Sequence, residues 1–207
     1  MKLWKIRLIF AKVLRIGLNR PALNDCEIDK KSKVCEGTQA TRVKMGKYSY
    51  IGCFCFLVNT EIGKFCSIAD NCRIGGAEHP LNRLSMSPVF HDGKNVLGTN
   101  FNNIPAVPTR ETIIGNDVWI GANCCIKSGV SIADGAVVGM GSIVVHDIGP
   151  YEIWAGNPAK LIRKRFDDDT IDRLLHTQWW ELDDSEIGKF AEYIDDVEKV
   201  IECIEGK

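Results

Sequence analysis

A six-residue period is the feature of this 207-residue chain that most restricts how it can fold. Branched aliphatic residues recur at every sixth position from residue 114 onward, and a small or aliphatic residue follows each of them four positions later. The first series is Ile114, Ile120, Ile126, Ile132, Val138 and Val144, and the second is Val118, Cys124, Val130, Ala136, Ser142 and Ile148. This period fits neither the 3.6 residues per turn of a helix nor the alternation of a flat strand. It is typical of a solenoid in which short strands are joined by sharp corners.

Three such strands complete one triangular coil, so Ile114 is expected to stack on Ile132 at the ~4.8 Å spacing of neighbouring strands. The same register occurs earlier in the chain, with one-residue slips between residues 40 and 45 and between residues 57 and 62. Its members are Ile28, Val34, Met45, Ile51, Leu57, Ile62, Ile68 and Ile74. The pattern therefore predicts a core made of aliphatic stacks that run along the solenoid.

Four of the nine cysteines, Cys55, Cys66, Cys72 and Cys124, fall at the small inward positions of this register. A buried thiol behaves there as a compact apolar side chain. The number of cysteines is odd and no secretory signal is evident, so we expect a reduced, cytoplasmic compartment. The remaining spacings lack the paired C-x2-C pattern of a zinc site, and no metal is expected.

Charge is distributed unevenly along the chain. Residues 1–20 hold six Lys or Arg and no acid, whereas residues 167–207 hold four basic and fourteen acidic side chains. The region between them is only weakly positive, which argues against general nucleic-acid binding. The basic segment 1–20 has two interpretations: a cap over the open end of the solenoid, or an amphipathic helix in weak contact with an anionic membrane surface.

These patterns divide the chain into three parts. They are the basic segment 1–20, the predicted β-helix of residues 21–162, and a C-terminal helical segment of residues 163–207. In the last part, a first helix is capped by Asp167 to Asp169 and a second follows Ser185. The six-residue period stops over residues 76–113, which are rich in proline and glycine. A loop of this length within a compact domain is usually functional.

Particular motifs resemble the hexapeptide-repeat acyltransferases, whose fold is a left-handed parallel β-helix. They are the hexads beginning at Ile114 and Ile120, the Gly139-Met140-Gly141-Ser142 step, and the segment from Ala155 to Lys160. The chain also resembles the branch that contains xenobiotic acetyltransferases, such as those for streptogramin and chloramphenicol, and polysaccharide O-acetyltransferases. That narrower resemblance rests on Ile62 to Ile68, His79-Pro80 with the long loop, and the run from Arg165-Phe166 to Trp179-Trp180.

The resemblance implies transfer of an acetyl group from acetyl-CoA to a hydroxyl of a sugar, a polysaccharide precursor or a related small acceptor. An alcohol is a weak nucleophile near neutral pH, so this reaction needs a base, and histidine suits the task. His79 matches the family's catalytic histidine, which implies direct transfer in a ternary complex. The resemblance also implies a homotrimer with active sites between subunits.

Further site residues follow from the same resemblance. The expected contacts to acetyl-CoA are Ala122 and Met140 along a groove, Val145 and His146 near the nucleotide, and Lys160 and Arg163 at the phosphates. Charge-assisted hydrogen bonds favour Lys and Arg at phosphates, although Lys160 and Arg163, with Lys164 and Arg165, could instead balance the acidic C-terminal segment. In the acceptor region, His91 is a candidate contact, and Trp119 either faces the acceptor loop or packs on the outside of the coil.

Several alternatives remain at this point. The acceptor group could be the amine of a sugar, or the hydroxyl of an antibiotic of the streptogramin or chloramphenicol type. A γ-type carbonic anhydrase would use the same solenoid, but its zinc site needs three histidines on adjacent faces. A solenoid that only binds a partner would show no affinity for coenzyme A.

Overall fold

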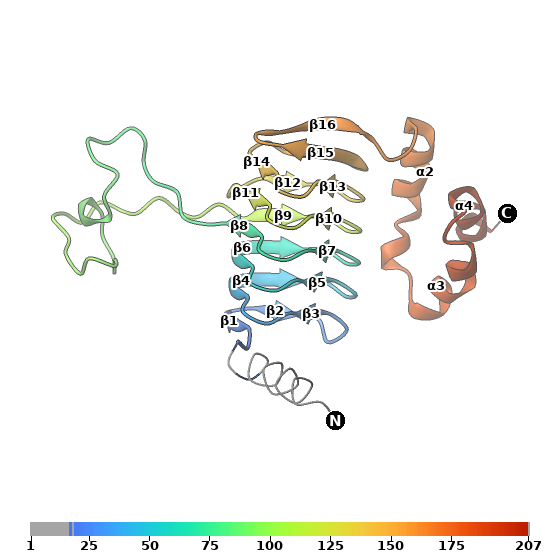
Figure 1. Cartoon of the computed structure of the whole chain (residues 1–207), viewed down its shortest axis with the longest axis horizontal. Coiled ribbons are helices and arrows are strands. Elements are labelled where there is room, and N and C mark those ends of the chain that lie inside the picture. Colours follow the sequence, from blue (N-terminus) through green and yellow to red (C-terminus); the bar gives the residue numbers. More distant parts are fainter. Residues whose placement is uncertain (1–16, 18, 207) are drawn as a thin grey trace, which may run out of the picture.

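The computed structural model describes Gly17 and residues 19–206. Its centre is a column of parallel β-coils with three flat faces; a long loop projects from one side and a group of helices packs on the other (Figure 1). The predicted β-helix with a long loop and C-terminal helices is confirmed. Most of segment 1–20 lies outside the described residues.

The strands fall into three faces, each a stack of mostly parallel strands. Face one contains β1 (Ala22–Asn24), the first half of β4 (Gln39–Met45), the first half of β6 (Phe56–Ile62), β8 (Arg73–Gly75), β11 (Cys125–Ile126) and β14 (Ile143–Val144). Face two contains β2 (Glu27–Ile28), the second halves of β4 and β6, β9 (Thr112–Ile114) and β12 (Ser131–Ile132). Face three contains β3 (Lys33–Val34), β5 (Tyr50–Ile51), β7 (Ser67–Ile68), β10 (Trp119–Ile120), β13 (Val137–Val138), β15 (Glu152–Gly156) and β16 (Ala159–Lys164).

The aliphatic stacks lie in the predicted register. Ile114 pairs with Ile132 on one side and with Ile62 on the other, and these side chains are almost fully buried. Pairing of Ile62 with Ile114 joins β6 to β9, so the aliphatic stack continues without a break although the long loop separates these strands in the sequence. Each buried aliphatic side chain removes apolar surface from water, which is the main contribution that holds one coil on the next.

We name the three edges of the coil by what lies on them. The helix corner joins faces two and three, the groove corner joins faces three and one, and the loop leaves from the arm corner between faces one and two. Most corners turn through a residue with positive φ, such as Asp117, Asn123, Gly129, Gly135 and Gly141 in the later coils. Coils approach so closely that a Cβ on Gly121 would lie 2.6 Å from the backbone nitrogen of Met140.

The one-residue slips predicted near residues 42 and 59 are confirmed at the arm corner. There β4 and β6 run from face one into face two without leaving the sheet, and Arg42 and Asn59 take positive φ values of 52° and 51°. The early coils thus omit one residue at this corner, while their inward positions still stack on those of the next coil.

The inward cysteines are buried and free, as predicted. Each thiol donates to a backbone carbonyl of the next coil, for example from Cys72 Sγ to the Gly121 oxygen at 3.2 Å and from Cys124 Sγ to the Gly139 oxygen at 3.2 Å. Burial raises the pKa of the Cys66 thiol to about 12. These thiols therefore pack the corners and link neighbouring coils.

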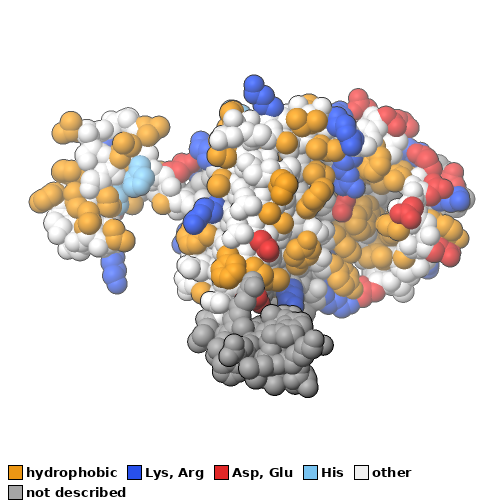
Figure 2. All heavy atoms as spheres, in the orientation of Figure 1, with side chains coloured by type: hydrophobic (Ala, Val, Ile, Leu, Met, Phe, Trp, Pro, Cys, Tyr) orange, Lys and Arg blue, Asp and Glu red, His pale blue; other side chains and the backbone are white. Residues whose placement is uncertain are grey.

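The loop, which we call the arm, comprises residues 76–111 and extends far from the coil (Figure 1). It holds one short 3-10 helix, η1 (Pro88–Phe90). The arm ends two residues before the predicted boundary of 113, because Thr112 is fully buried and already pairs with Thr60 in β9. Large apolar side chains gather on its surface (Figure 2): Leu81, Leu84, Met86, Phe90, Val96, Leu97, Phe101 and Ile104.

The end of the chain differs in two ways from the sequence expectation. An antiparallel hairpin of β15 and β16 closes the solenoid, and β16 continues to Lys164, past the expected boundary at residue 162. The helices are α2 (Asp168–Thr177), η2 (Trp179–Glu181), α3 (Asp184–Phe190), η3 (Ala191–Tyr193) and α4 (Val197–Glu205). The expected single helix after Ser185 is therefore divided, since the chain turns between α3 and α4 and Asp196 caps the second of them.

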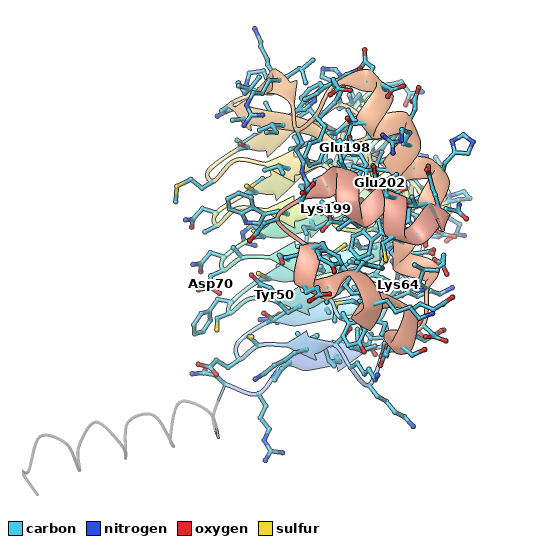
Figure 3. The ribbon with its side chains drawn as sticks, turned by 90° about the vertical axis from the view of Figure 1, so that its right-hand side faces the viewer. Tyr50, Lys64, Asp70, Glu198, Lys199 and Glu202 are labelled. Atoms are coloured by element: carbon cyan, nitrogen blue, oxygen red, sulfur yellow. The ribbon has the colours of Figure 1, made fainter. Side chains whose placement is uncertain are left out.

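Contacts with the coil fix the helices on the helix corner, where they lie in front of the coils in the view of Figure 3. Phe65 packs against Trp179 with ring centroids 4.8 Å apart, and Lys64 pairs with Glu181 at 2.7 Å. Lys47 of an earlier coil pairs with Asp184 of α3 at 2.5 Å. Among the described residues no helix is long and apolar enough to cross a bilayer.

Candidate active site

His79 lies at the base of the arm, where the chain has just left β8, and its side chain is exposed. The outgoing and returning segments of this base are held together by an ion pair between Glu78 Oε1 and Arg110 Nη2 at 2.6 Å. Ser128 donates its hydroxyl to the Arg110 carbonyl at 2.9 Å, which ties the returning segment to the arm corner. The residue beside the histidine, Pro80, is buried.

The Glu78 and Arg110 pair was missed from the sequence. Arg110 lowers the pKa of the Glu78 carboxyl, so the pair stays ionised next to His79. The available signal was an acid directly before the histidine together with a basic residue just before the period resumes. Because the two positions are separated by the whole arm, the pairing itself could not be read from spacing.

Val145 and His146 share the arm corner with this base. Lys127 N donates to the Val144 oxygen at 2.9 Å, and Ser131 N donates to Asp147 Oδ1 at 2.8 Å, so the corner segments of these two coils are direct neighbours. His146 is exposed. The structure therefore brings the expected nucleotide-end residues to the corner from which the His79 segment departs.

Ala122, Met140 and Lys160 lie on a different corner, the groove corner. Gly141 N donates to the Ala122 oxygen at 2.8 Å, which places Met140 directly beside Ala122 on the next coil. Lys160 pairs with Ala155 in the closing hairpin, and Ala155 abuts Gly139. Met140 is 75% exposed and projects outward. Within one chain, face one separates these residues from the base of the arm.

Trp119 and Arg163 belong to a third location, on face three. Trp119 pairs with Val137, Val137 with Ile153, and Ile153 with Arg163, which forms a row across the strands. A groove of about 570 Å³ runs along this face, lined in part by Trp119 and Tyr50. Trp119 is 55% exposed and packs outside the coil.

His91 lies in the outer part of the arm. The ring Nδ1 of His91 is 3.2 Å from the Asp92 carbonyl oxygen, and the side-chain amide of Asn100 donates to the backbone carbonyl of His91. Phe90 and Phe101 stack beside it with ring centroids 5.6 Å apart. Of the residues that the structure describes, no group of three or more His, Cys, Asp or Glu side chains is placed to hold a metal ion.

Comparison with known proteins places this arrangement in a family. Residues 111–145 match the family model described as the hexapeptide repeat of succinyl-transferase. The chain is 39% identical over 155 residues to a chloramphenicol acetyltransferase of Agrobacterium fabrum, covering 66% of this chain and 74% of the relative. It is 42% identical over 135 residues to a Lysinibacillus sphaericus protein named "Probable macrolide acetyltransferase", covering 61% of this chain and 71% of the relative.

Solved structures agree on the fold. A galactoside acetyltransferase in complex with coenzyme A superimposes with a TM-score of 0.50 and 25% identity, covering 76% of this chain and 71% of that one. A hexapeptide-repeat acetyltransferase from Vibrio cholerae superimposes with a TM-score of 0.50 and 20% identity, covering 77% and 81%.

Coil, arm and relatives together define an acyltransferase built on a parallel β-helix. The chain belongs to the hexapeptide-repeat acyltransferases, in the branch that contains the chloramphenicol acetyltransferases.

The ion pair at the base of the arm gives a first prediction. Arg110→Met should lower kcat by about three- to tenfold, because loss of the ion pair with Glu78 leaves the adjacent His79 less well positioned toward a substrate. The KM for the acyl donor should stay unchanged. The exchange Glu78→Arg with Arg110→Glu restores the pair in the opposite direction and should recover most of kcat. If Arg110→Met alters neither kcat nor its pH profile, the pair has no positioning role.

Proposed function

We propose that the protein transfers an acetyl group from acetyl-CoA to a hydroxyl of a small acceptor, with His79 as the general base. The observation that carries this proposal is the place of His79, exposed on an arm base that is pinned to the coil at Arg110 and Ser128. A base must come within hydrogen-bond reach of the proton that it removes, and this side chain is free to do so. The names of the relatives, chloramphenicol and macrolide acetyltransferases, support the same reaction class.

Acetyl-CoA supplies the acetyl group as an activated thioester. The imidazole of His79 takes the proton of the acceptor hydroxyl while the acceptor oxygen forms a bond to the acetyl carbon. The bond from that carbon to sulfur breaks, and the proton held by His79 is then available to the departing thiolate. The products are an acetyl ester and coenzyme A, and the imidazole returns to its neutral form.

The groove corner suits a long, narrow donor. Ala122 is half-buried and has a small side chain, so it leaves room for a ligand beside the exposed Met140 of the next coil. Lys160 is exposed at the end of the same corner, where its ammonium group can contact a phosphate. Val145 and His146 lie on the arm corner and Arg163 on face three, so these residues meet the same donor only if a second chain contributes to the site.

We therefore propose a homotrimer in which the base of the arm from one chain faces the groove corner of another. Two features support it: His79 and Ala122 occupy different corners of one coil, and the arm projects from its own coil with a largely apolar surface (Figures 1 and 2). Large exposed apolar patches mark interaction sites. A neighbouring subunit would cover part of this surface and leave the rest open to the site between the chains.

Mixing two inactive variants tests this assembly. His79→Ala lacks the base, and Ala122→Trp obstructs the groove corner, so each homotrimer should be nearly inactive. If each site takes its base and its groove from different chains, random mixing at equal amounts should restore about a quarter of the sites. Co-expression with two different affinity tags provides the mixed trimers. Absence of recovered activity in verified mixed trimers would place the whole site within one chain.

The acceptor has two candidates, a sugar hydroxyl and an antibiotic hydroxyl. The apolar side chains of the arm, among them Phe90, Phe101 and Ile104, favour an acceptor with a substantial apolar body over a bare sugar. Release of coenzyme A should be measured with chloramphenicol, a macrolide, a streptogramin and paired hydroxyl and amino sugars. Mass spectrometry of the product should locate the acetyl group on oxygen. Acetylation only of an amine would replace this proposal by the N-acetyltransferase alternative, and failure to bind coenzyme A would replace it by a binding solenoid.

A further inference from the structure

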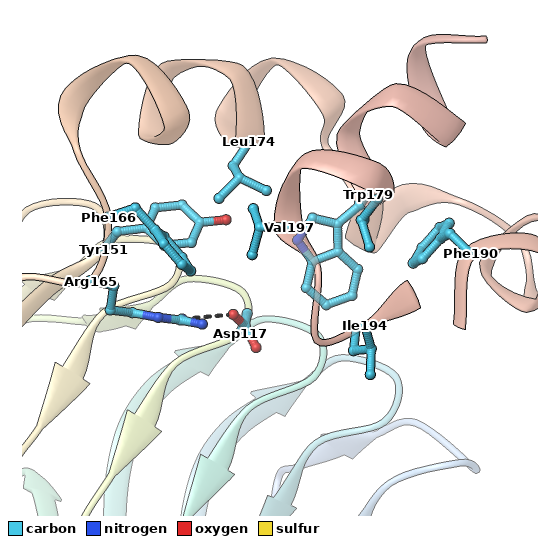
Figure 4. A pocket seen from close by; sticks show the side chains of 10 residues that line it. Asp117, Tyr151, Arg165, Phe166, Leu174, Trp179, Phe190, Ile194 and Val197 are labelled. Atoms are coloured by element: carbon cyan, nitrogen blue, oxygen red, sulfur yellow. Dashed lines mark hydrogen bonds and ion pairs between the residues drawn. The ribbon is translucent and has the colours of Figure 1, made fainter. Parts of the chain in front are cut away.

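A hollow of about 280 Å³ lies between the helix corner and the C-terminal helices, and none of the predicted site residues lines it (Figure 4). Tyr151, Asp117 and Arg165 line it from the coil side. Leu174, Trp179 and Val197 line it from the helices. A cavity of roughly 150 Å³ is known to hold benzene, so this one has room for a ring with a substituent.

The hydroxyl of Tyr151 is the feature that points to a ligand. The side chain is 1% exposed, and its oxygen has no partner within hydrogen-bond geometry among the described residues. The indole N–H of Trp179 interacts with this oxygen from outside that geometry, and because it can only donate, the hydroxyl proton has no acceptor. Figure 4 shows this oxygen directed into the hollow, toward the space between Leu174 and Val197. Burial raises the pKa of Tyr151 to about 12, an effect that the nearby Trp179 indole partly offsets, so the hydroxyl keeps its proton. Buried hydroxyl groups almost always have a partner, and one without a partner costs stability.

The charges in the hollow compensate each other. Arg165 Nη1 donates to Asp117 Oδ2 at 2.9 Å and to the Gly135 oxygen at 2.8 Å. Its guanidinium lies 5.2 Å from the centroid of the Tyr151 ring and 5.3 Å from that of Phe166. Arg165 and Asp117 already neutralise each other, so a charged ligand would have no free opposite charge in this partly buried hollow, which is unfavourable. The remaining walls are apolar or aromatic, so they favour a neutral ring.

We propose that this hollow binds a small neutral aromatic alcohol whose oxygen forms a hydrogen bond with the Tyr151 hydroxyl. The site lies apart from the proposed catalytic machinery and does not depend on it. Asp117 and Arg165 also line the groove that contains Trp119, so the ion pair is a shared wall between the hollow and face three.

Calorimetric titration with 4-methylphenol tests the proposal on the full chain. The unaltered protein should bind about one molecule per chain. Tyr151→Phe keeps the shape but lacks the hydroxyl, and it should bind roughly tenfold more weakly, the expected effect of one lost hydrogen bond. Val197→Trp fills the hollow and should abolish binding, while Leu23→Trp on the exposed first coil serves as the matched control and should bind normally. Circular dichroism should confirm that each variant folds.

Three results would contradict binding of an aromatic alcohol at Tyr151. Absence of saturable heat in the unaltered protein, or equal affinity in all four proteins, would overturn the proposal. A crystal structure in which ordered water holds the Tyr151 hydroxyl and 4-methylphenol does not displace it would also overturn it. Acetyl transfer by Tyr151→Phe should stay unchanged, so a failure of this site and a failure of the proposed reaction can be distinguished.

In the absence of any ligand, Tyr151→Phe should raise the melting temperature or leave it unchanged. The substitution removes a buried hydroxyl that lacks a hydrogen-bond partner and keeps the ring, whose centroid lies 5.8 Å from that of Phe166. Thermal unfolding at one protein concentration measures this. A clear decrease would mean that the hydroxyl has a partner within the folded chain, and the argument for a ligand would fail.

Discussion

Replacing His79 by alanine is expected to lower acetyl transfer by about 100-fold or more while the protein remains folded. The side chain is exposed at the base of the arm, and the structure gives it no packing role in the coil. Its loss therefore removes the proposed base and leaves the aliphatic stacks intact. Initial rates of coenzyme A release at saturating donor and acceptor measure the effect, with circular dichroism as the check on folding.

His176→Ala is the matched control for this substitution. His176 is an exposed histidine near the end of α2, and its ring Nδ1 lies 3.2 Å from the Asp172 carbonyl oxygen. Its replacement should leave the rate within about twofold of the unaltered protein, because surface changes away from a site usually have small effects. Full activity of His79→Ala would eliminate the assignment of the base, whichever way the control behaves.

The second large effect concerns stability and compares two neighbouring isoleucines of β9. Ile114 points into the coil and is 1% exposed, whereas Ile113 points outward and is 47% exposed. Ile114→Ala should lower the free energy of unfolding by about 2–5 kcal/mol, because it leaves a cavity in a close-packed stack. Ile113→Ala should lower it by less than about 1 kcal/mol.

Denaturant unfolding at one fixed protein concentration measures both changes, since an assembly makes apparent stability depend on concentration. The comparison tests the register directly, because a one-residue slip would exchange the two side chains. Equal losses for the two variants would contradict the stacking of Ile114 between Ile62 and Ile132.

The coil could be predicted from the sequence because its determinants are local and repeat. The inward residues such as Ile120 and Val138 recur at a fixed interval, and a buried cysteine at position 124 follows the same rule. Even the slips near residues 42 and 59 were visible, because the register shifted by one residue at each. The antiparallel return of β16 was not, since its pairing with β15 depends on the end of the stack and not on a repeat.

The candidate site was predictable in part. The sequence indicated which residues resemble those of the family, and the structure places His79 with Val145 and His146 at one corner. Ala122 lies on the groove corner, where the coil turns from face three to face one, whereas His79 lies at the arm corner, where the coil would turn from face one to face two. A site divided in this way cannot be completed from one chain's pattern. The hollow at Tyr151 could not be predicted from the sequence either, because it forms only where α2 and α4 pack against the coil.

A crystal structure of the protein with coenzyme A and an acceptor would test the central claim most directly, through the distance from His79 to the reacting atoms. We predict that one imidazole nitrogen lies within about 3.2 Å of the acceptor hydroxyl, next to the sulfur of a coenzyme A bound along the groove corner of a neighbouring chain. An imidazole remote from that sulfur in every copy of the assembly would contradict the account.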